Sequence, residues 1–209
     1  FSQGADASFG TPGPRPAGNL VGLDGVDDFV LTPNLRGAFS NSSVTIELWF
    51  RADGPSVIVD ERGQLPSIPG WQNSQMEILV SGQIKVRVWD LPAISIGTGR
   101  FGTWHHAALR YSSESGLLQG FLDGVSGPGA SGTRKVPWAF GYGLYYGFGL
   151  GDTAHLAIGG FLRGQIDEIR IWNVARSDQD IRQDRLRRLC GDEPGLICYW
   201  RFDETGTRA

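Results

Sequence analysis

The segment GQIDEIRIWNVA, residues 164–175, reads as a strand that runs directly into the start of a helix. With the period of two of a strand, Asp167 shares a face with Ile169 and Ile171, whereas Ile166 lies on the other face. A carboxylate in an apolar row costs free energy unless it is hydrogen-bonded, paired with a cation or bound to a metal. We therefore expect a local feature that compensates Asp167.

The composition favours many short strands over a helical bundle. The 209 residues include 31 Gly and 11 Pro but a single Met, and 7 Trp and 11 Phe supply rigid apolar bulk. The net charge is −3, and positive charge is concentrated only in a short run of arginines near residue 185. Phosphate binding needs an extended basic face, so nucleic acid is not an expected partner. No window approaches about 18 apolar residues, so no membrane span is expected.

Alternating segments punctuated by turns predict an all-β sandwich of two antiparallel sheets over residues 20–209, after an irregular lead-in over residues 1–19. In the predicted hairpin over residues 75–89, Lys85, Arg87 and Trp89 point outward. Further strands are predicted at VTIELWF (44–50), WHHAALRY (104–111), LLQGFLDGV (117–125), HLAIGG (155–160) and GLICYWRFDE (195–204).

One short surface helix is expected near the C-terminus, with Ser177 as its N-cap and Asp180 as the acid three residues on. Ile181, Leu186 and Leu189 give it a partial apolar stripe.

Two adjacent histidines, His105 and His106, resemble a metal site at first sight. Neighbouring residues of a strand point to opposite faces, so these two side chains do not easily chelate one ion. We expect structural or merely polar roles for both.

Residues 126–153 form a long segment between two strands, in which aromatic residues, Phe140 among them, alternate with glycines. Aromatic rings on such a backbone can stack on the apolar faces of sugars. The same composition also suits a contact with another protein, or a loop that folds over the sheet as part of the core. These alternatives stay open. The candidate ligand-binding residues are Trp138, Tyr142, Tyr145 and Tyr146 of this segment, together with Trp71 and Trp89.

The two cysteines, Cys190 and Cys198, flank the turn-rich sequence GDEPGLI. Such a loop can bring them within bridging distance, so we expect a disulfide, the alternative being a reduced, buried pair. Zinc is not expected, because two sulfurs without a neighbouring His make half a site. A disulfide indicates an oxidising compartment, and the predicted location is secreted, periplasmic or at the cell surface.

The sequence LDGVDD, residues 23–28, places three aspartates around an Asp-Gly turn. Asp24, Asp27 and Asp28 are more carboxylates than a turn requires, and oxygen-rich loops suit a hard cation such as Ca²⁺. A solvated acidic turn is the alternative.

Several of these motifs, in this order, resemble a laminin G-like domain of the concanavalin A-like lectin/glucanase superfamily, close to its pentraxin-like branch. The motifs are LDGVDDFV, WHHAALRY, FLDG, IGG, FLRGQIDEIRIWNVARSDQDIRQ and GLICYWRFDE, which span roughly residues 20–205. The resemblance implies a jelly-roll sandwich with one short helix late in the chain. It also implies a structural Ca²⁺ held by Asp24 or Asp27, with backbone oxygens near Gly25, beside Asp167.

Catalysis is not expected. The glucanases of this superfamily resemble one another in a strand with two glutamates flanking an aspartate at every-other spacing, and this sequence has no such run. The pairs Asp60-Glu61 and Asp167-Glu168 are adjacent, so their side chains diverge. Two functions remain: a non-catalytic carbohydrate-binding or adhesion module, or a protein–protein interaction subunit of a larger extracellular or surface assembly.

Overall fold

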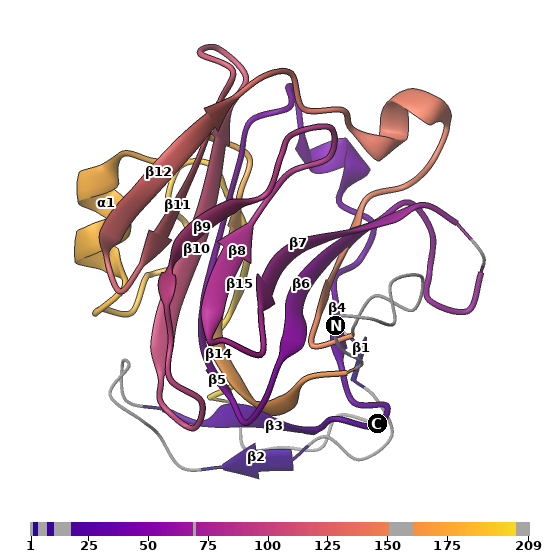
Figure 1. The fold of residues 1–209 in the computed structure, drawn as a ribbon. Coiled ribbons are helices and arrows are strands. Elements are labelled where there is room, and N and C mark those ends of the chain that lie inside the picture. Colours follow the sequence, from indigo (N-terminus) through magenta and orange to yellow (C-terminus); the bar gives the residue numbers. More distant parts are fainter. Residues whose placement is uncertain (1, 4–7, 11–17, 69, 151–160, 204–209) are drawn as a thin grey trace.

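Two antiparallel sheets face each other and enclose the core (Figure 1). The computed structural model describes the chain except for residues 1, 4–7, 11–17, 69, 151–160 and 204–209. The architecture confirms the predicted jelly-roll sandwich, with one α-helix near the C-terminus among the described residues.

The seven-stranded sheet has the order β1-β4-β13-β6-β7-β8-β9. Its strands are β1 (Ser2–Gln3), β4 (Val30–Leu31), β13 (Tyr145–Phe148), β6 (Ser56–Arg62), β7 (Gln72–Ile78), β8 (Gln83–Val86) and β9 (Ile94–Thr98). The predicted hairpin is β7 and β8, joined by a tight turn at Ser81-Gly82, and Ile84, Val86 and Val88 enter the core as the alternation predicts.

The eight-stranded sheet has the order β12-β11-β10-β5-β14-β3-β2, and β15 also pairs with β14. Its strands are β12 (Val125–Ser131), β11 (Leu117–Leu122), β10 (His105–Ser112), β5 (Val44–Ala52), β14 (Arg163–Trp172), β3 (Leu20–Asp24), β2 (Ser8–Gly10) and β15 (Leu196–Trp200). The helices are η1 (Arg36–Ala38), η2 (Pro137–Phe140) and α1 (Asp178–Asp184).

A β-bulge in β14 explains the acid in the apolar row. The register with β5 shifts between Asp167 and Arg170, and Glu168 has a left-handed φ of 50°. One extra residue at a bulge reverses the alternation that follows it, so Ile166, Ile169 and Ile171 all enter the core. The prediction that Asp167 shares the face of Ile169 and Ile171 is therefore wrong.

Helix α1 covers part of the outer face of the eight-stranded sheet (Figure 1). Ser177 accepts a hydrogen bond from the backbone N–H of Asp180, which confirms the predicted N-cap. Ile181 packs against Ala108 and Phe121 of the sheet, whereas Leu186 is exposed. The apolar stripe is thus narrower than predicted.

Buried charges attach this helix and the segments around it to the sheet. Glu47 of β5 accepts hydrogen bonds from Trp172 Nε1 at 2.9 Å and from Arg176 Nη1 at 2.8 Å. Arg176 also donates to Asp184 of α1, and Arg170 donates to the Asp184 carbonyl at 2.7 Å. We call Glu47, Arg170, Trp172, Arg176 and Asp184 the helix-side network.

Two segments expected to lack strands contain them. Within residues 1–19, β1 pairs with β4 and β2 pairs with β3, so the lead-in joins both sheets. Residues 126–153 are not one loop either, because β12, η2 and β13 lie within or overlap this range. Strand β12 was not predicted, because its glycine and proline residues are typical of loops. It pairs with β11, and the pairing contains a register shift. The strand predicted over residues 155–160 lies outside the described residues. In the described part of the chain, no helix has the length and apolar character that a membrane crossing requires.

Candidate functional site

Three aromatic rings meet at the rim of the seven-stranded sheet. Trp71 lies just before β7, Trp89 follows β8, and Phe140 belongs to η2. The ring centroids of Trp71 and Trp89 are 4.4 Å apart, and those of Trp89 and Phe140 are 5.3 Å apart. Phe140 is 57% exposed, and the two tryptophans are half-buried. We call these three residues the aromatic platform.

The local sequence holds η2 against this rim. Pro137 occupies the first turn of η2, where its fixed φ suits a helix start. Gly141 ends η2 with a left-handed φ of 85°, which other residues rarely adopt. Before η2, the backbone N–H of Lys135 donates to the Trp89 carbonyl at 3.2 Å. The chain thus places Phe140 beside Trp89 while leaving much of its ring exposed.

Polar side chains adjoin the platform along β7 and β8. Arg87 donates through Nε to the Ser74 carbonyl at 2.6 Å, and its two terminal amino groups have no partner among the described residues. The backbone N–H of Arg87 donates to the carbonyl of Gln75, whose buried side-chain amide has no hydrogen-bond partner in the described part of the chain. Lys135 and Asp90 form an exposed ion pair of 3.1 Å at the edge of this surface. The surface therefore combines apolar ring faces with unused hydrogen-bonding groups.

The structure brings Trp71 and Trp89 together with Phe140, which the sequence did not single out. Among the other candidates, Trp138 stacks on Phe39 with ring centroids 5.7 Å apart and packs against the core. The signal for Phe140 in the sequence is its spacing of two residues from Trp138. In a short helical turn, residues at this spacing face different sides, so a buried Trp138 predicts an exposed Phe140.

The tyrosine candidates differ in exposure. Tyr142 and Tyr145 are half-buried, and Tyr145 pairs with Arg62 across β13 and β6. Tyr146 is fully buried and donates its hydroxyl to Glu61 Oε2 at 2.9 Å. Burial and the neighbouring Glu61 raise the pKa of Tyr146 well above its ordinary value, although the nearby Arg134 opposes this. Tyr146 is part of the interior and offers no ring face for stacking.

The acidic turn after β3 gathers three carboxylates. Oxygen atoms of Asp24, Asp27 and Asp28 all lie within 4.8 Å of one another. Asp24 Oδ1 accepts the Val26 N–H at 2.7 Å, and Asp28 Oδ2 accepts the Asp24 N–H at 3.1 Å. Gly25 has a φ of 81°, as the predicted Asp-Gly turn requires. The oxygen-only donor set fits a hard cation.

Asp167 is not part of this group. In the antiparallel pairing of β3 and β14, Asp24 lies opposite Arg163. Asp167 is four residues further along β14, which is about 13 Å at ~3.3 Å per residue. The expectation that Asp167 joins Asp24 or Asp27 around one ion is therefore wrong, and Asp28 takes its place in the group.

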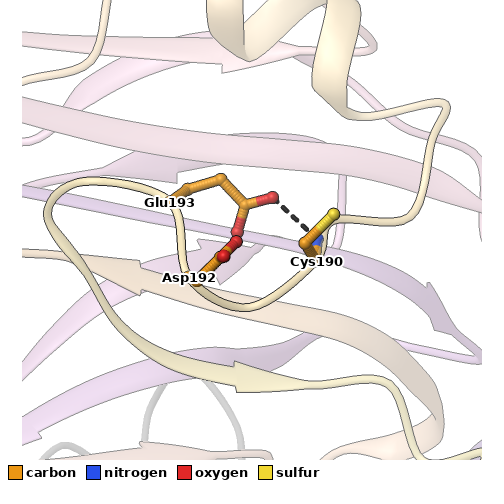
Figure 2. A group of neighbouring side chains, drawn as sticks. All are labelled: Cys190, Asp192 and Glu193. Atoms are coloured by element: carbon orange, nitrogen blue, oxygen red, sulfur yellow. Dashed lines mark hydrogen bonds between the residues drawn. The ribbon is translucent and has the colours of Figure 1, made fainter.

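Both cysteines are free in the structure, so the expected disulfide is absent from it. Cys190 is exposed, whereas burial raises the pKa of the Cys198 thiol to about 12. Figure 2 shows Cys190 beside Asp192 and Glu193, with ligand atoms within 4.8 Å of one another. Glu193 accepts the backbone N–H groups of Cys190 at 2.7 Å and Gly191 at 2.9 Å. Slight burial opposes ionisation of Glu193, but these N–H groups lower its pKa, so the carboxylate serves to close the turn.

The adjacent histidines have different partners, as strand geometry predicts. His105 Nδ1 lies 2.9 Å from Asp123 Oδ2, whereas the buried His106 has its Nε2 3.4 Å from Glu47 Oε2. Three of the four adjacent acids are engaged with arginines: Asp60 with Arg62 at 2.9 Å, Glu61 with Arg134, and Glu168 with Arg170 at 2.7 Å.

The two antiparallel sheets of this β-sandwich define the class of protein as a lectin-like jelly roll. The family described as the concanavalin A-like lectin/glucanases superfamily matches residues 24–182, well over half of the chain. The chain belongs to this superfamily, which confirms the resemblance drawn from its motifs.

Solved structures share the fold at low sequence identity. A Bacteroides ovatus ATCC 8483 protein described as carbohydrate-binding has 19% identity and a TM-score of 0.58 over 80% of this chain, which spans only 47% of that protein. Domain 4 of AbnA, an extracellular GH43 arabinanase from Geobacillus stearothermophilus crystallised with arabinotriose, has 14% identity and a TM-score of 0.59, covering 88% of this chain and 82% of that one. A heptameric SAP-like pentraxin from Limulus polyphemus has 14% identity and a TM-score of 0.53, covering 95% and 91%. No curated protein matches the chain significantly.

Proposed function

We propose that this protein is a non-catalytic carbohydrate-binding module and that saccharides bind on the aromatic platform. The observation that carries the proposal is the contact of Trp71, Trp89 and Phe140 at an exposed rim, beside unused polar groups of Arg87. Pyranose and furanose rings expose C–H groups that pack on aromatic faces, while their hydroxyls need nearby hydrogen-bond partners. The relatives with carbohydrate in their descriptions support this class of ligand.

Binding of neutral oligosaccharides by isothermal titration calorimetry, after a glycan-array screen, tests the proposal. We expect Trp71→Ala and Trp89→Ala each to weaken binding about tenfold or more, because central aromatic contacts carry much of a binding energy. Phe101→Ala is the matched control, since Phe101 is an exposed aromatic residue on the separate loop before β10. Unchanged affinity in both tryptophan variants, with loss in a Trp138→Ala/Tyr145→Ala variant, would move the site to the predicted ligand-binding residues of the 126–153 segment.

The proposed absence of catalysis is supported by the engagement of the adjacent acids with arginines. Glu61 and Arg134 are completely buried, and Asp60 and Arg62 are nearly so. A glycosidase needs two carboxyl groups that can reach the scissile bond from opposite sides. Reducing ends released from the bound oligosaccharide over a day are the measurement, and release above the rate of a heat-inactivated control contradicts the proposal.

We further propose that Asp24, Asp27 and Asp28 bind a structural Ca²⁺, since their carboxylates form an oxygen-only group. A bound ion stabilises the folded state by RT ln(1 + [L]/Kd), so EGTA lowers the melting temperature of the native protein. Asp27→Asn removes this calcium dependence, and Asp192→Asn, in the group of Figure 2, is the control that retains it. An unchanged melting temperature with EGTA, and no calcium in elemental analysis, would exclude the site.

A role as an interaction subunit of a larger extracellular or surface assembly is the second candidate function. Leu65 and Ile68, in the connection that leads to Trp71, are 41% and 46% exposed, which suits a protein contact. Sedimentation velocity tests one form of this function, self-association. If the protein self-associates through this surface, a Leu65→Ser/Ile68→Ser variant should be monomeric. We place the protein outside the cytoplasm, secreted, periplasmic or on the cell surface, and fractionation of the source cells tests this.

A further inference from the structure

We infer that the aromatic platform binds an acidic saccharide, one that carries a carboxylate, and that Arg87 is the residue that recognises the charge. This inference rests on the proposed function of the platform and adds the chemical class of its ligand. The inference begins from Arg87, which lies between the end of β8 and Trp89 and whose two terminal amino groups have no partner among the described residues.

The position of Arg87 follows from strand geometry. Exposure alternates from Lys85 to Trp89, with Val86 and Val88 in the core, so the side chains of Arg87 and Trp89 point to the same outer side. The hydrogen bond from Arg87 Nε to the Ser74 carbonyl carries the guanidinium across to β7, the strand that Trp71 precedes. Trp89 reaches the same side, because its ring contacts that of Trp71. The guanidinium and the platform therefore form one continuous surface.

The fixed orientation of the guanidinium suits a carboxylate. The Nε hydrogen bond fixes the plane of the group and leaves Nη1 and Nη2, the pair of donors that a carboxylate or a hydroxyl can accept from. Other arginines in the described part of the chain are used differently: Arg134 and Arg170, for example, are buried and paired with Glu61 and Glu168. An oriented cation that is half-buried and without an acidic partner is available to a ligand.

Neighbouring charges do not neutralise Arg87. Asp90 is paired with Lys135, so the two cancel at the edge of the surface. Lys85 precedes Arg87 on the same face and pairs in the sheet with Glu77, but no ion pair joins these two side chains in the described structure. The local charge beside the platform is thus positive although the chain as a whole carries −3.

Buried polar groups beside Arg87 add a second observation. Gln75 is completely buried, and both its amide oxygen and its amide nitrogen lack a hydrogen-bond partner among the residues that the structure describes. Leaving such groups unpaired costs free energy, so they favour a polar ligand or ordered water near this part of β7. Ordered water can join these buried groups to the hydroxyls of a sugar acid, whose carboxylate accepts from Arg87.

The test compares two ligands that differ only in charge. Calorimetry measures the affinity of the intact protein for trigalacturonic acid and for its methyl ester, which keeps the same rings and hydroxyls. We expect the acid to bind about tenfold more tightly than the ester, a difference of about 1.4 kcal/mol. Raising the ionic strength should weaken binding of the acid and leave that of the ester unchanged.

Two variants locate the charge recognition. Arg87→Gln should lower the affinity for the acid to that of the ester, and should leave the ester unaffected. Lys85→Gln, which removes the same charge from the same strand two residues away, should change affinity for the acid by less than about twofold. Circular dichroism melting of both variants checks that they fold.

The outcomes separate this inference from the proposed function. Equal binding of acid and ester, or equal losses in Arg87→Gln and Lys85→Gln, overturns recognition by Arg87. Binding of neutral oligosaccharides alone, lost in Trp89→Ala, overturns the acidic ligand and preserves the platform. Failure of neutral and acidic saccharides alike, across the glycan array, overturns both.

Discussion

The outer face of the eight-stranded sheet and the outer rim of the seven-stranded sheet use charged and aromatic residues in opposite ways. Beneath α1, Glu47 lies between Trp172 and Arg176, and every one of these side chains is buried. Beside the platform, Trp89 is half-buried and Arg87 keeps two unused donors. Charges that are paired inside the protein hold the fold, whereas oriented groups left unused at a surface are available for recognition.

Glu47→Ala tests the covered face and should have the largest effect. It leaves Arg176 without its buried carboxylate partner and Trp172 without an acceptor. Removing one partner of a buried ion pair costs about 3–5 kcal/mol, so the free energy of unfolding should fall by this amount in urea denaturation. Glu77→Ala is the control, because Glu77 is half-buried and forms no ion pair in the described structure. Similar losses in the two variants would contradict the structural role of the helix-side network.

Trp89→Ala tests the open rim and should cost less stability. Truncation of fully buried large aromatic residues costs about 3–5 kcal/mol, and a half-buried ring loses a fraction of that, about 1–2 kcal/mol. Trp172→Ala on the covered face is the matched comparison, since Trp172 is 2% exposed, donates to Glu47 and lies 3.9 Å beneath the Arg176 guanidinium. Equal losses of unfolding free energy for the two tryptophans would remove the distinction between the faces.

The pH dependence of the stability is the next test, because His106 is buried on the covered face. His106 lies among Glu47, Arg170, Arg185 and the Trp49 ring, and burial lowers its pKa below the ordinary 6.5. As the pH falls through about 6.5, the unfolded chain takes up a proton that the folded chain does not, so the free energy of unfolding decreases. Burial opposes ionisation of Glu47, but His106 and the charges of Arg170 and Arg176 lower its pKa below the ordinary 4.5. Protonation of this carboxylate therefore reduces the free energy of unfolding only below about pH 4.5.

Thermal unfolding between pH 7.5 and 5.5 measures the contribution of His106. The melting temperature should decrease across this window, and His106→Gln should flatten the decrease. His105→Gln is the control, because His105 lies at a partly exposed contact with Asp123. A decrease that persists unchanged in His106→Gln would show that another group is responsible.

Features that depend on residues close together in the sequence were predicted correctly, whereas features that depend on contacts between distant segments were not. Strand β5, the β7–β8 hairpin and the N-cap at Ser177 depend on alternation and turn chemistry within a few residues, and they were predicted correctly. The bulge at Glu168 depends on pairing with a strand more than a hundred residues away, which periodicity does not record. The misplaced Asp167 follows directly from this bulge.

The candidate site shows the same limit. Trp89 was predicted to point outward and Trp71 was placed in a loop, but the contact between their rings was not predicted, and their binding role stays a prediction. Tyr146 was a candidate ligand-binding residue but a short strand buries it, whereas Phe140 was not a candidate and a 3₁₀ turn exposes it. In a glycine-rich segment, neither outcome follows from composition.

The smallest effect concerns the two thiols, which lie on either side of the turn before β15. Cys190 is exposed, whereas Cys198 is half-buried and burial raises its pKa to about 12, so little thiolate forms at neutral pH. We expect one thiol to react rapidly with Ellman's reagent in the native protein and two after denaturation. Tyr199, next to Cys198, donates to Glu168 at 2.7 Å and so connects β15 to Arg170 of the helix-side network.

Because of this contact, the reactivity of Cys198 should depend on the helix-side network and not on the aromatic platform. In Glu47→Ala, Cys198 should react faster than in the wild type, because the weakened network lets β15 open more often. Trp89→Ala should leave the rate unchanged, since the platform lies on the other sheet. Absence of any reactive thiol in the denatured, unreduced protein would show that the two cysteines form the disulfide expected from the sequence. Equal acceleration by both variants would indicate that β15 opens only with the whole fold.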